Sequence, residues 1–228
     1  MTHALGLAGL ALLVGCGSSP DKVTVFAAAS TADVVEDALG TTSRVSVGAT
    51  SSLARQIRQG APADVFVAAD LEWVEWLERE GVEVCGAFEV ATGRLVVVGP
   101  LGAKPSPLGG LEDASLRVVL ADPDHVPAGR YARQALEWLG VWESVAARAV
   151  RAGNVRSALA SVEAGVADRA VVYASDAQAS RRVEVVHVFD DSLASPRFVV
   201  AVLGEQGKKV ARRLREARWA DAGFGALP

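Results

Sequence analysis

Small and hydroxyl-bearing residues recur at four points where an apolar, strand-like run of this sequence passes into a helix-like one. The four points are residues 27–30, 49–52, 126–129 and 154–155. A helix N-terminus presents backbone N–H groups without partners and the positive end of the helix dipole, and both suit an anion. Because such helix ends meet at the carboxyl edge of an open α/β sheet, the pattern predicts an anion cage of hydroxyls and backbone amides. Any one cap alone is a common structural feature.

The same four points carry helix-start signals. Ser30 and Asp33 form an S-x-x-D pattern, which predicts a capping box. Pro127 suits the first turn of the helix that follows it, and Asn154 predicts the cap of a helix at Val155. We therefore expect the first N–H groups of these helices to face the cage.

The motifs that would indicate an enzyme are absent from the sequence. It contains no G-x-S-x-G, P-loop, H-E-x-x-H or C-x-x-C pattern, and no G-x-G-x-x-G after a strand. His125 and His187 have no ligand-spaced partners, so we expect structural roles for both and no metal-ligating side chains. Ser30 has no histidine at a recognisable spacing, as a hydrolytic nucleophile would need. The chain is therefore not expected to be an enzyme or to carry a cofactor.

Apolar strand-like runs alternate with amphipathic helical runs along the chain. The predicted strands are residues 23–28, 44–47, 64–68, 94–98, 117–121, 170–173, 183–188 and 198–203. The predicted helices are residues 30–39, 51–59, 71–79, 128–139, 154–163 and 206–218, and residues 99–110 are expected to form a loop. This alternation indicates an α/β protein with two lobes, each a mostly parallel sheet flanked by helices.

Composition limits the class of protein further. The chain has 228 residues, 27 acidic and 23 basic side chains, and a net charge of -4, and half of its residues are hydrophobic. Such a chain can bury a real core, which excludes a disordered protein. The basic residues near the C-terminus lie at helical spacing, and we expect a solvated helix face there: Lys208, Lys209, Arg212, Arg213 and Arg215. No nucleic-acid partner is expected.

Residues 1–16 are expected to be an export signal. Residues 4–14 are apolar but too few to span a membrane, which takes about 20 residues. Residues 13–16 (LVGC) resemble the lipobox of bacterial lipoproteins, which implies lipidation of Cys16 and a tether over residues 17–22. Cys85 is then the single remaining cysteine, so no internal disulfide is possible. We expect Cys85 to be a small buried hydrophobic side chain.

Five segments carry a resemblance to a known family. VTVFAAAS, SLARQIRQGAPADVFVAAD, LADPDHVPAGRYARQAL, NVRSALASVEAG and VVYASDAQAS occur in this order over residues 23–203. They closely resemble the periplasmic molybdate-binding proteins (ModA type), the solute-binding components of ABC importers. The resemblance implies a type II periplasmic binding-protein fold, with residues 23–93 and 198–228 in lobe I and 94–197 in lobe II. It also implies that molybdate, with tungstate as an alternative, binds in the cleft for delivery to an ABC permease.

The resemblance also implies which groups hold the anion. They are the hydroxyl and amide of Ser30, Thr50, the backbone amides of Ala128 and Val155, and the phenolic hydroxyl of Tyr173. Relatives commonly have two serines where this chain has Ala49 and Thr50, so Ser51 is an alternative source of the second hydroxyl. The metal would enter only inside its oxyanion. All candidate groups are neutral donors, which suits a fully ionised dianion.

Several alternatives remain open from the sequence. The same fold could bind another tetrahedral oxyanion such as sulfate or phosphate. Asp122 and Asp124 could accept the proton of a hydrogen phosphate, although we expect them to be turn and helix-start residues. A hydrolytic enzyme and a structural lipoprotein without a ligand are the other classes. We expect a monomer in the periplasm or at the cell-envelope surface, anchored to the membrane through Cys16.

Overall fold

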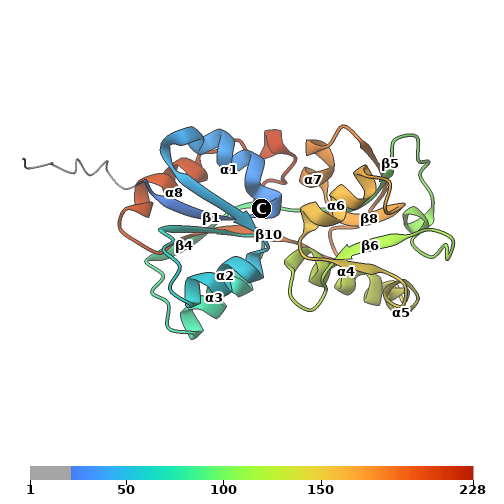
Figure 1. Cartoon of the computed structure of the whole chain (residues 1–228), viewed down its shortest axis with the longest axis horizontal. Helices are drawn as coiled ribbons and strands as arrows, with labels where there is room; N and C mark the ends of the chain where they lie inside the picture. The colour runs from blue at the N-terminus through green and yellow to red at the C-terminus, as the bar shows by residue number, and fades with distance from the viewer. Residues whose placement is uncertain (1–21, 228) are drawn as a thin grey trace, which may run out of the picture.

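The computed structural model describes residues 22–227. The predicted export signal, Cys16 and the predicted tether up to residue 21 lie outside this range. Two five-stranded sheets lie side by side along the long axis of the molecule, and helices cover both faces of each (Figure 1). The α/β class and the two lobes predicted from the sequence are confirmed. Within residues 22–227, every helix is too short or too polar to cross a membrane.

Lobe I contains the first sheet, with strand order β2-β1-β3-β10-β4. Its strands are β1 (Thr24–Ala28), β2 (Arg44–Gly48), β3 (Val65–Ala68), β4 (Gly86–Thr92) and β10 (Arg197–Val202). Its helices are α1 (Ala32–Leu39), α2 (Thr50–Arg58), α3 (Leu71–Arg79) and α8 (Gly207–Arg215). Strand β1 pairs in parallel with β2 and β3, while β10 is antiparallel to both of its neighbours. Helices α1 and α8 cover one face, and α2 and α3 cover the other (Figure 1).

Lobe II contains the second sheet, with strand order β7-β6-β8-β5-β9. Its strands are β5 (Leu95–Pro100), β6 (Val118–Ala121), β7 (Val150–Ala152), β8 (Arg169–Tyr173) and β9 (Val183–Val188). Its helices are α4 (Pro127–Trp138), α5 (Trp142–Ala146), α6 (Val155–Glu163) and α7 (Ala174–Ala179). Strand β5 runs against the other strands, as β10 does in lobe I, so each sheet is mostly parallel as predicted.

The central strands are buried on both faces, which explains why they read as continuous apolar runs. Every residue of β1, β3 and β6 is buried. A strand with helices on only one face would alternate between apolar and polar residues. The carboxyl ends of β1 and β8 lie toward the junction of the lobes, and the helices that follow these strands begin near it (Figure 1).

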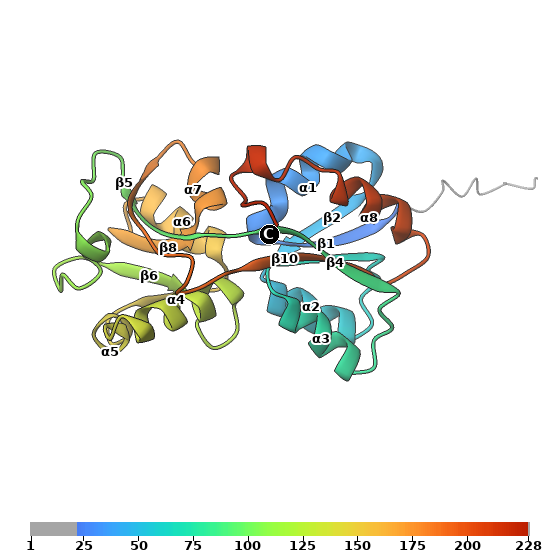
Figure 2. The same ribbon diagram turned by 180° about the vertical axis from the view of Figure 1, so that it is seen from behind.

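The chain crosses between the lobes twice, from β4 to β5 and from β9 to β10. Both crossings are visible from behind, where they run close together (Figure 2). The Gly93 N–H donates to the Pro196 carbonyl oxygen at 2.8 Å. Arg94 on one crossing forms two hydrogen bonds, of 2.8 and 2.6 Å, with the Asp191 carboxylate on the other. The two crossings are therefore bound to each other.

Several elements were not predicted from the sequence. Strand β4 is an edge strand that begins with Gly86, and most of its residues are only partly buried or exposed, so its apolar signal is weak. Strand β7 has three residues, α5 has five and α7 has six. The predicted loop of residues 99–110 includes the end of β5 and a 3-10 turn at Pro107–Gly110. Strand β7 and helices α5 and α7 are too short to show a clear period.

Cys85 contradicts the sequence-based expectation. It is exposed and free, not buried. It lies immediately before β4, where its N–H donates to the Val202 carbonyl oxygen at 2.8 Å. The basic face of α8 is exposed as expected, whereas Val210, Ala211 and Leu214 are its buried side.

Candidate anion-binding site

A small cavity lies between the lobes, at the carboxyl ends of the strands. From lobe I it is lined by Ala28, Ala29, Ser30, Gly48, Ala49, Thr50 and Ala69. From lobe II it is lined by Val126, Pro127, Ala128, Asn154, Val155 and Tyr173. The structure thus brings together all five residues that the resemblance assigned to the ligand, along with the four helix-start segments.

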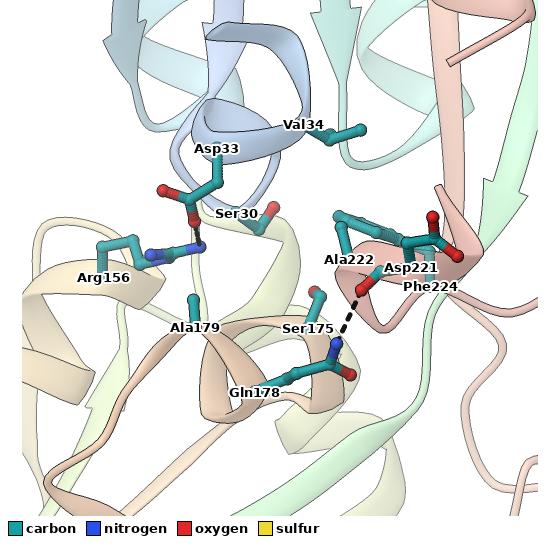
Figure 3. Close-up of a pocket in the computed structure, with 10 residues that line it drawn as sticks. All are labelled: Ser30, Asp33, Val34, Arg156, Ser175, Gln178, Ala179, Asp221, Ala222 and Phe224. Atoms are coloured by element: carbon teal, nitrogen blue, oxygen red, sulfur yellow. Dashed lines mark hydrogen bonds and ion pairs between the residues drawn. The ribbon is translucent and has the colours of Figure 1, made fainter. Parts of the chain in front are cut away.

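Ser30 lies in a 3-10 turn, Ala29–Thr31, between β1 and α1. The predicted capping box is wrong, because the residue before α1 is Thr31 and its side chain makes no capping hydrogen bond. Asp33 instead pairs with the guanidinium of Arg156 at 2.6 Å. Ser30 is buried, and it lines both the cavity and a neighbouring pocket that opens between α1 and α7 (Figure 3).

Thr50 is the first residue of α2, and its hydroxyl is oriented by a backbone group. The Ala69 N–H donates to Thr50 Oγ1 at 3.2 Å. Because Oγ1 accepts this bond, its own proton remains available for an acceptor in the cavity. Ser51 is absent from the lining, and its buried Oγ has no partner among the described residues. The geometry therefore favours Thr50 over Ser51 as the second hydroxyl.

Ala128 and Val155 occupy the first turns of α4 and α6. N–H groups at these positions have no acceptor within their own helix. The Asn154 side chain caps α6 as predicted, accepting from the Ser157 N–H at 2.8 Å. The start of α4 is pressed against the end of β6, since a Cβ added at Gly129 would lie 2.2 Å from the Ala121 carbonyl oxygen. A glycine is needed there, and this close contact fixes where Ala128 presents its amide.

Tyr173 ends β8 and is 1% exposed. Its hydroxyl has no hydrogen-bond partner among the described residues, which is costly for a buried polar group, by about 1–3 kcal/mol. Burial raises the pKa of Tyr173 well above its usual range, so the hydroxyl keeps its proton and acts as a donor. The ring packs edge-on against Phe198 of lobe I, with ring centres 5.4 Å apart. Tyr173 therefore brings to the cavity lining a buried donor without an acceptor.

None of the described residues that line the cavity has a charged side chain. Asp122 and Asp124 lie outside it and both pair with Arg151. Asp122 Oδ1 also accepts from the Asp124 N–H at 3.1 Å, which agrees with the turn role expected for it. The lining therefore combines side-chain hydroxyls and helix-start amides with no carboxylate to accept a proton.

The two histidines within the described residues show no ligand geometry. His187 lies on β9 and packs edge-on against Phe189, with ring centres 5.1 Å apart, and partial burial lowers its pKa. His125 is exposed on the turn before α4. Residues 22–227 contain no group of three or more His, Cys, Asp or Glu side chains placed to hold a metal ion.

The sequence pattern of the family described as bacterial extracellular solute-binding protein matches residues 23–222. The chain belongs to this family. The Molybdate-binding protein ModA of Haemophilus influenzae is 37% identical over 206 residues, which cover 83% of this chain and 79% of that protein. The ModA of Escherichia coli (strain K12) is 36% identical over 200 residues, covering 80% and 77%.

Solved structures of solute-binding proteins share this fold. The periplasmic molybdate-binding protein of Azotobacter vinelandii matches with a TM-score of 0.75 and 24% identity, over 91% of this chain and 100% of that one. The sulfate-binding protein SubI of Mycobacterium tuberculosis H37Rv matches with a TM-score of 0.73 and 16% identity, over 90% and 86%. Proteins named for two different oxyanions thus share the architecture, so the fold alone does not select the anion.

Proposed function

We propose that this solute-binding protein captures molybdate, or tungstate, in the cavity between its lobes and delivers it to the permease of an ABC importer. The observation that carries the proposal is the lining of the cavity, which combines neutral hydrogen-bond donors from both lobes with no charged side chain. The names of the relatives that are 36% and 37% identical support molybdate as the anion.

Five residues are proposed to hold the anion. Ser30 and Thr50 donate hydroxyl groups from lobe I, and the Tyr173 hydroxyl donates from lobe II. The backbone N–H groups of Ala128 and Val155 complete the set at the starts of α4 and α6. Such preorganised dipoles stabilise a dianion without a counter-ion, as helix N-termini do for phosphate.

The absence of a carboxylate acceptor gives the cavity a basis for selecting its anion. Molybdate carries no proton at neutral pH, whereas the O–H of hydrogen phosphate would find no carboxylate in the lining and would have to turn a hydroxyl from donor to acceptor. The mismatch leaves a buried donor unpaired and costs about 1–3 kcal/mol. The cavity therefore favours fully ionised dianions.

Calorimetric titration with molybdate, tungstate, sulfate and phosphate tests the proposal. We expect molybdate and tungstate to bind far more tightly than phosphate, and molybdate to resist displacement by equimolar sulfate. Size separates molybdate from sulfate, because only a rigid cage can distinguish two dianions of the same charge and shape. Displacement by sulfate would reject molybdate as the substrate. Equal affinity for phosphate would reject the donors-only site.

We also propose that residues 23–93 with 198–228 move as one body against residues 94–197. The candidate donors belong to both bodies, so the anion can engage all of them only when the cleft is closed. The anion should therefore shift the protein from open to closed forms. Small-angle scattering should show a smaller radius of gyration at saturating molybdate, and an unchanged radius would reject the closing cleft. Binding and release need no catalytic group and no cofactor, and the protein is proposed to act as a monomer.

The protein is proposed to be lipid-anchored through Cys16 in the periplasm or at the cell-envelope surface. The LVGC sequence at residues 13–16 supports this, because it matches the pattern of a lipobox. The Cys16→Ser variant should leave the membrane fraction of lipid-labelled cells, since residues 4–14 are too few to span a bilayer. Unchanged membrane retention would reject the lipid anchor.

A further inference from the structure

Two arginines of lobe II reach across the cleft to acidic residues of lobe I. They are Arg156 on α6 and Arg130 on α4. Neither lines the cavity. Each lies within two residues of a proposed amide donor, since Arg156 follows Val155 and Arg130 lies two positions after Ala128.

Arg156 connects three segments that carry proposed donors. One of its nitrogens donates to Asp33 of lobe I at 2.6 Å, as Figure 3 shows, and another donates to Asp176 of lobe II at 2.6 Å. The second oxygen of Asp176 accepts from the Tyr173 N–H at 3.1 Å. Asp33 lies three residues after Ser30. The guanidinium therefore holds the segments of Ser30, Val155 and Tyr173 in one network.

The two partners of Arg156 differ in how they are bound to the protein. Asp176 is 0% exposed and has lost its hydration, so its pairing with Arg156 is required within lobe II. Asp33 is 60% exposed and would be hydrated again if the lobes separated. Opening of the cleft therefore breaks the pair with Asp33 and leaves the pair with Asp176 intact.

Arg130 makes a second contact of the same kind. It pairs with Asp70, at 3.4 Å, and with Glu72, and both acids lie at the start of α3 in lobe I. The Asp70 side chain also caps α3 by accepting from the Glu72 N–H at 2.9 Å. This contact joins α4 to α3, while Arg156 joins α6 to α1. These helix pairs lie on opposite faces of the two sheets, so the contacts lie on either side of the junction (Figure 1).

We propose that Arg130 and Arg156 are positioning residues that stabilise the closed form. Each pairs with lobe I only when the lobes are closed, so each raises the fraction of closed protein. We call these interlobe ion pairs closure latches. The inference rests on the proposed function, because closure is what completes the anion site. Apparent affinity scales with the fraction of protein that is competent to bind. The latches therefore strengthen binding and slow release without touching the anion.

Repulsion of the anion by the acidic partners would have the opposite effect on affinity. The direction in which affinity changes therefore decides between repulsion and the latch. Asp33 and Glu72 are negative charges close to a site for a dianion. If repulsion of the anion were their main effect, neutralising them would tighten binding. If they hold the latches, neutralising them weakens binding.

The acidic partners are the right residues to change. Loss of Arg156 would strand the buried carboxylate of Asp176 and could unfold the protein. Asp33→Asn removes the exposed charge that pairs with Arg156. Its matched control is Asp37→Asn on the same helix, because Asp37 pairs with Arg218 inside lobe I. Glu72→Gln has a matched control in Glu75→Gln on α3, because Glu75 pairs with Arg79 of its own helix.

The first measurement is the dissociation constant for molybdate by calorimetry. We expect Asp33→Asn and Glu72→Gln each to raise it about two- to fivefold relative to its control, as exposed ion pairs typically do when broken. The double variant should raise it by about the product of the two effects, and dissociation should accelerate in parallel. Melting temperatures should match those of the controls. Affinity equal to or tighter than that of the controls would overturn the latch.

The second measurement is the closed fraction without any anion, which separates the latch from the proposed substrate. The Cys16→Ser, Lys104→Cys chain carries only two cysteines, the native Cys85 of lobe I and the new one on lobe II, and both positions are exposed. Spin labels there report the distance between the lobes. We expect the latch variants to shift this distance toward open forms, and the controls to leave it unchanged. An unchanged distribution would overturn the latch even if molybdate binds, and a shift would support it even if molybdate proves to be the wrong anion.

Discussion

The Tyr173 hydroxyl gives the sharpest test of the proposed site. The group is buried, it belongs to a residue that lines the cavity, and no described residue accepts its proton. Tyr173→Phe removes this one oxygen and retains the ring that packs against Phe198. The variant therefore separates the role of the hydroxyl from the packing of the residue.

The expected loss follows from the chemistry of the missing bond. A hydrogen bond to a charged acceptor contributes about 1.5–3 kcal/mol. Since 1.4 kcal/mol corresponds to about a tenfold change, molybdate affinity should fall about ten- to a hundredfold. Without the anion, the melting temperature should stay level or rise, because the variant no longer buries an unpaired hydroxyl. The rise in melting temperature on adding molybdate should be smaller than in the wild type.

Calorimetry and thermal unfolding on the same samples give both readouts. The chain has two tyrosines, so Tyr131→Phe is the matched control. Tyr131 lies on α4 outside the cavity lining, and its variant should bind molybdate within about twofold of the wild type. If Tyr173→Phe also bound within twofold, the hydroxyl would not be a ligand group and the reasoning from its missing partner would be refuted.

Three further outcomes are expected. Thr50→Val should weaken molybdate binding about ten- to a hundredfold in calorimetry, while Ser51→Ala should leave it unchanged, because the Ser51 hydroxyl does not line the cavity. Gly129→Ala should lower the unfolding free energy in urea titrations by about 1–3 kcal/mol or more, since the added methyl would overlap the Ala121 carbonyl. Complete burial raises the pKa of the Asp176 carboxyl to about 6 from 3.8, which carbon-13 NMR should detect as its titration midpoint. As pH rises, the unfolded chain loses the Asp176 proton before the folded protein does. Asp176 should therefore lower the free energy of unfolding by about 3 kcal/mol between pH 3.8 and 6, with no further change above pH 6. A midpoint near 3.8 would contradict the raised pKa.

Features that depend on local periodicity were predictable from the sequence. The doubly buried runs of β1, β3 and β6 stand out because helices cover both faces of each sheet. Pro127 and Asn154 mark the starts of α4 and α6, and both signals are local. The four cap segments and their convergence followed from these signals and from the general geometry of parallel sheets.

Features that depend on contacts distant in sequence were not predictable in the same way. The S-x-x-D pattern at Ser30 and Asp33 indicated a local cap, but an arginine 123 positions away from Asp33 binds its carboxylate. Cys85 follows the alternating sequence VEV, yet it is exposed immediately before an edge strand. Whether a side chain faces the core or solvent at such a place depends on which strand pairs beside it, and the sequence does not state that pairing.

The neutral lining of the cavity has a consequence for unloading. A site that held its anion with a lysine or arginine would keep a fixed countercharge after opening, and the transporter would have to overcome that attraction. Here the proposed donors are divided between the two lobes, with Ser30 and Thr50 on one side and Tyr173 on the other. Separation of the lobes therefore removes the donors of one lobe from the anion in a single movement. Water can replace these donors without any proton transfer. A transporter that pulls the lobes apart would therefore weaken the hold on the proposed anion without having to neutralise a fixed charge.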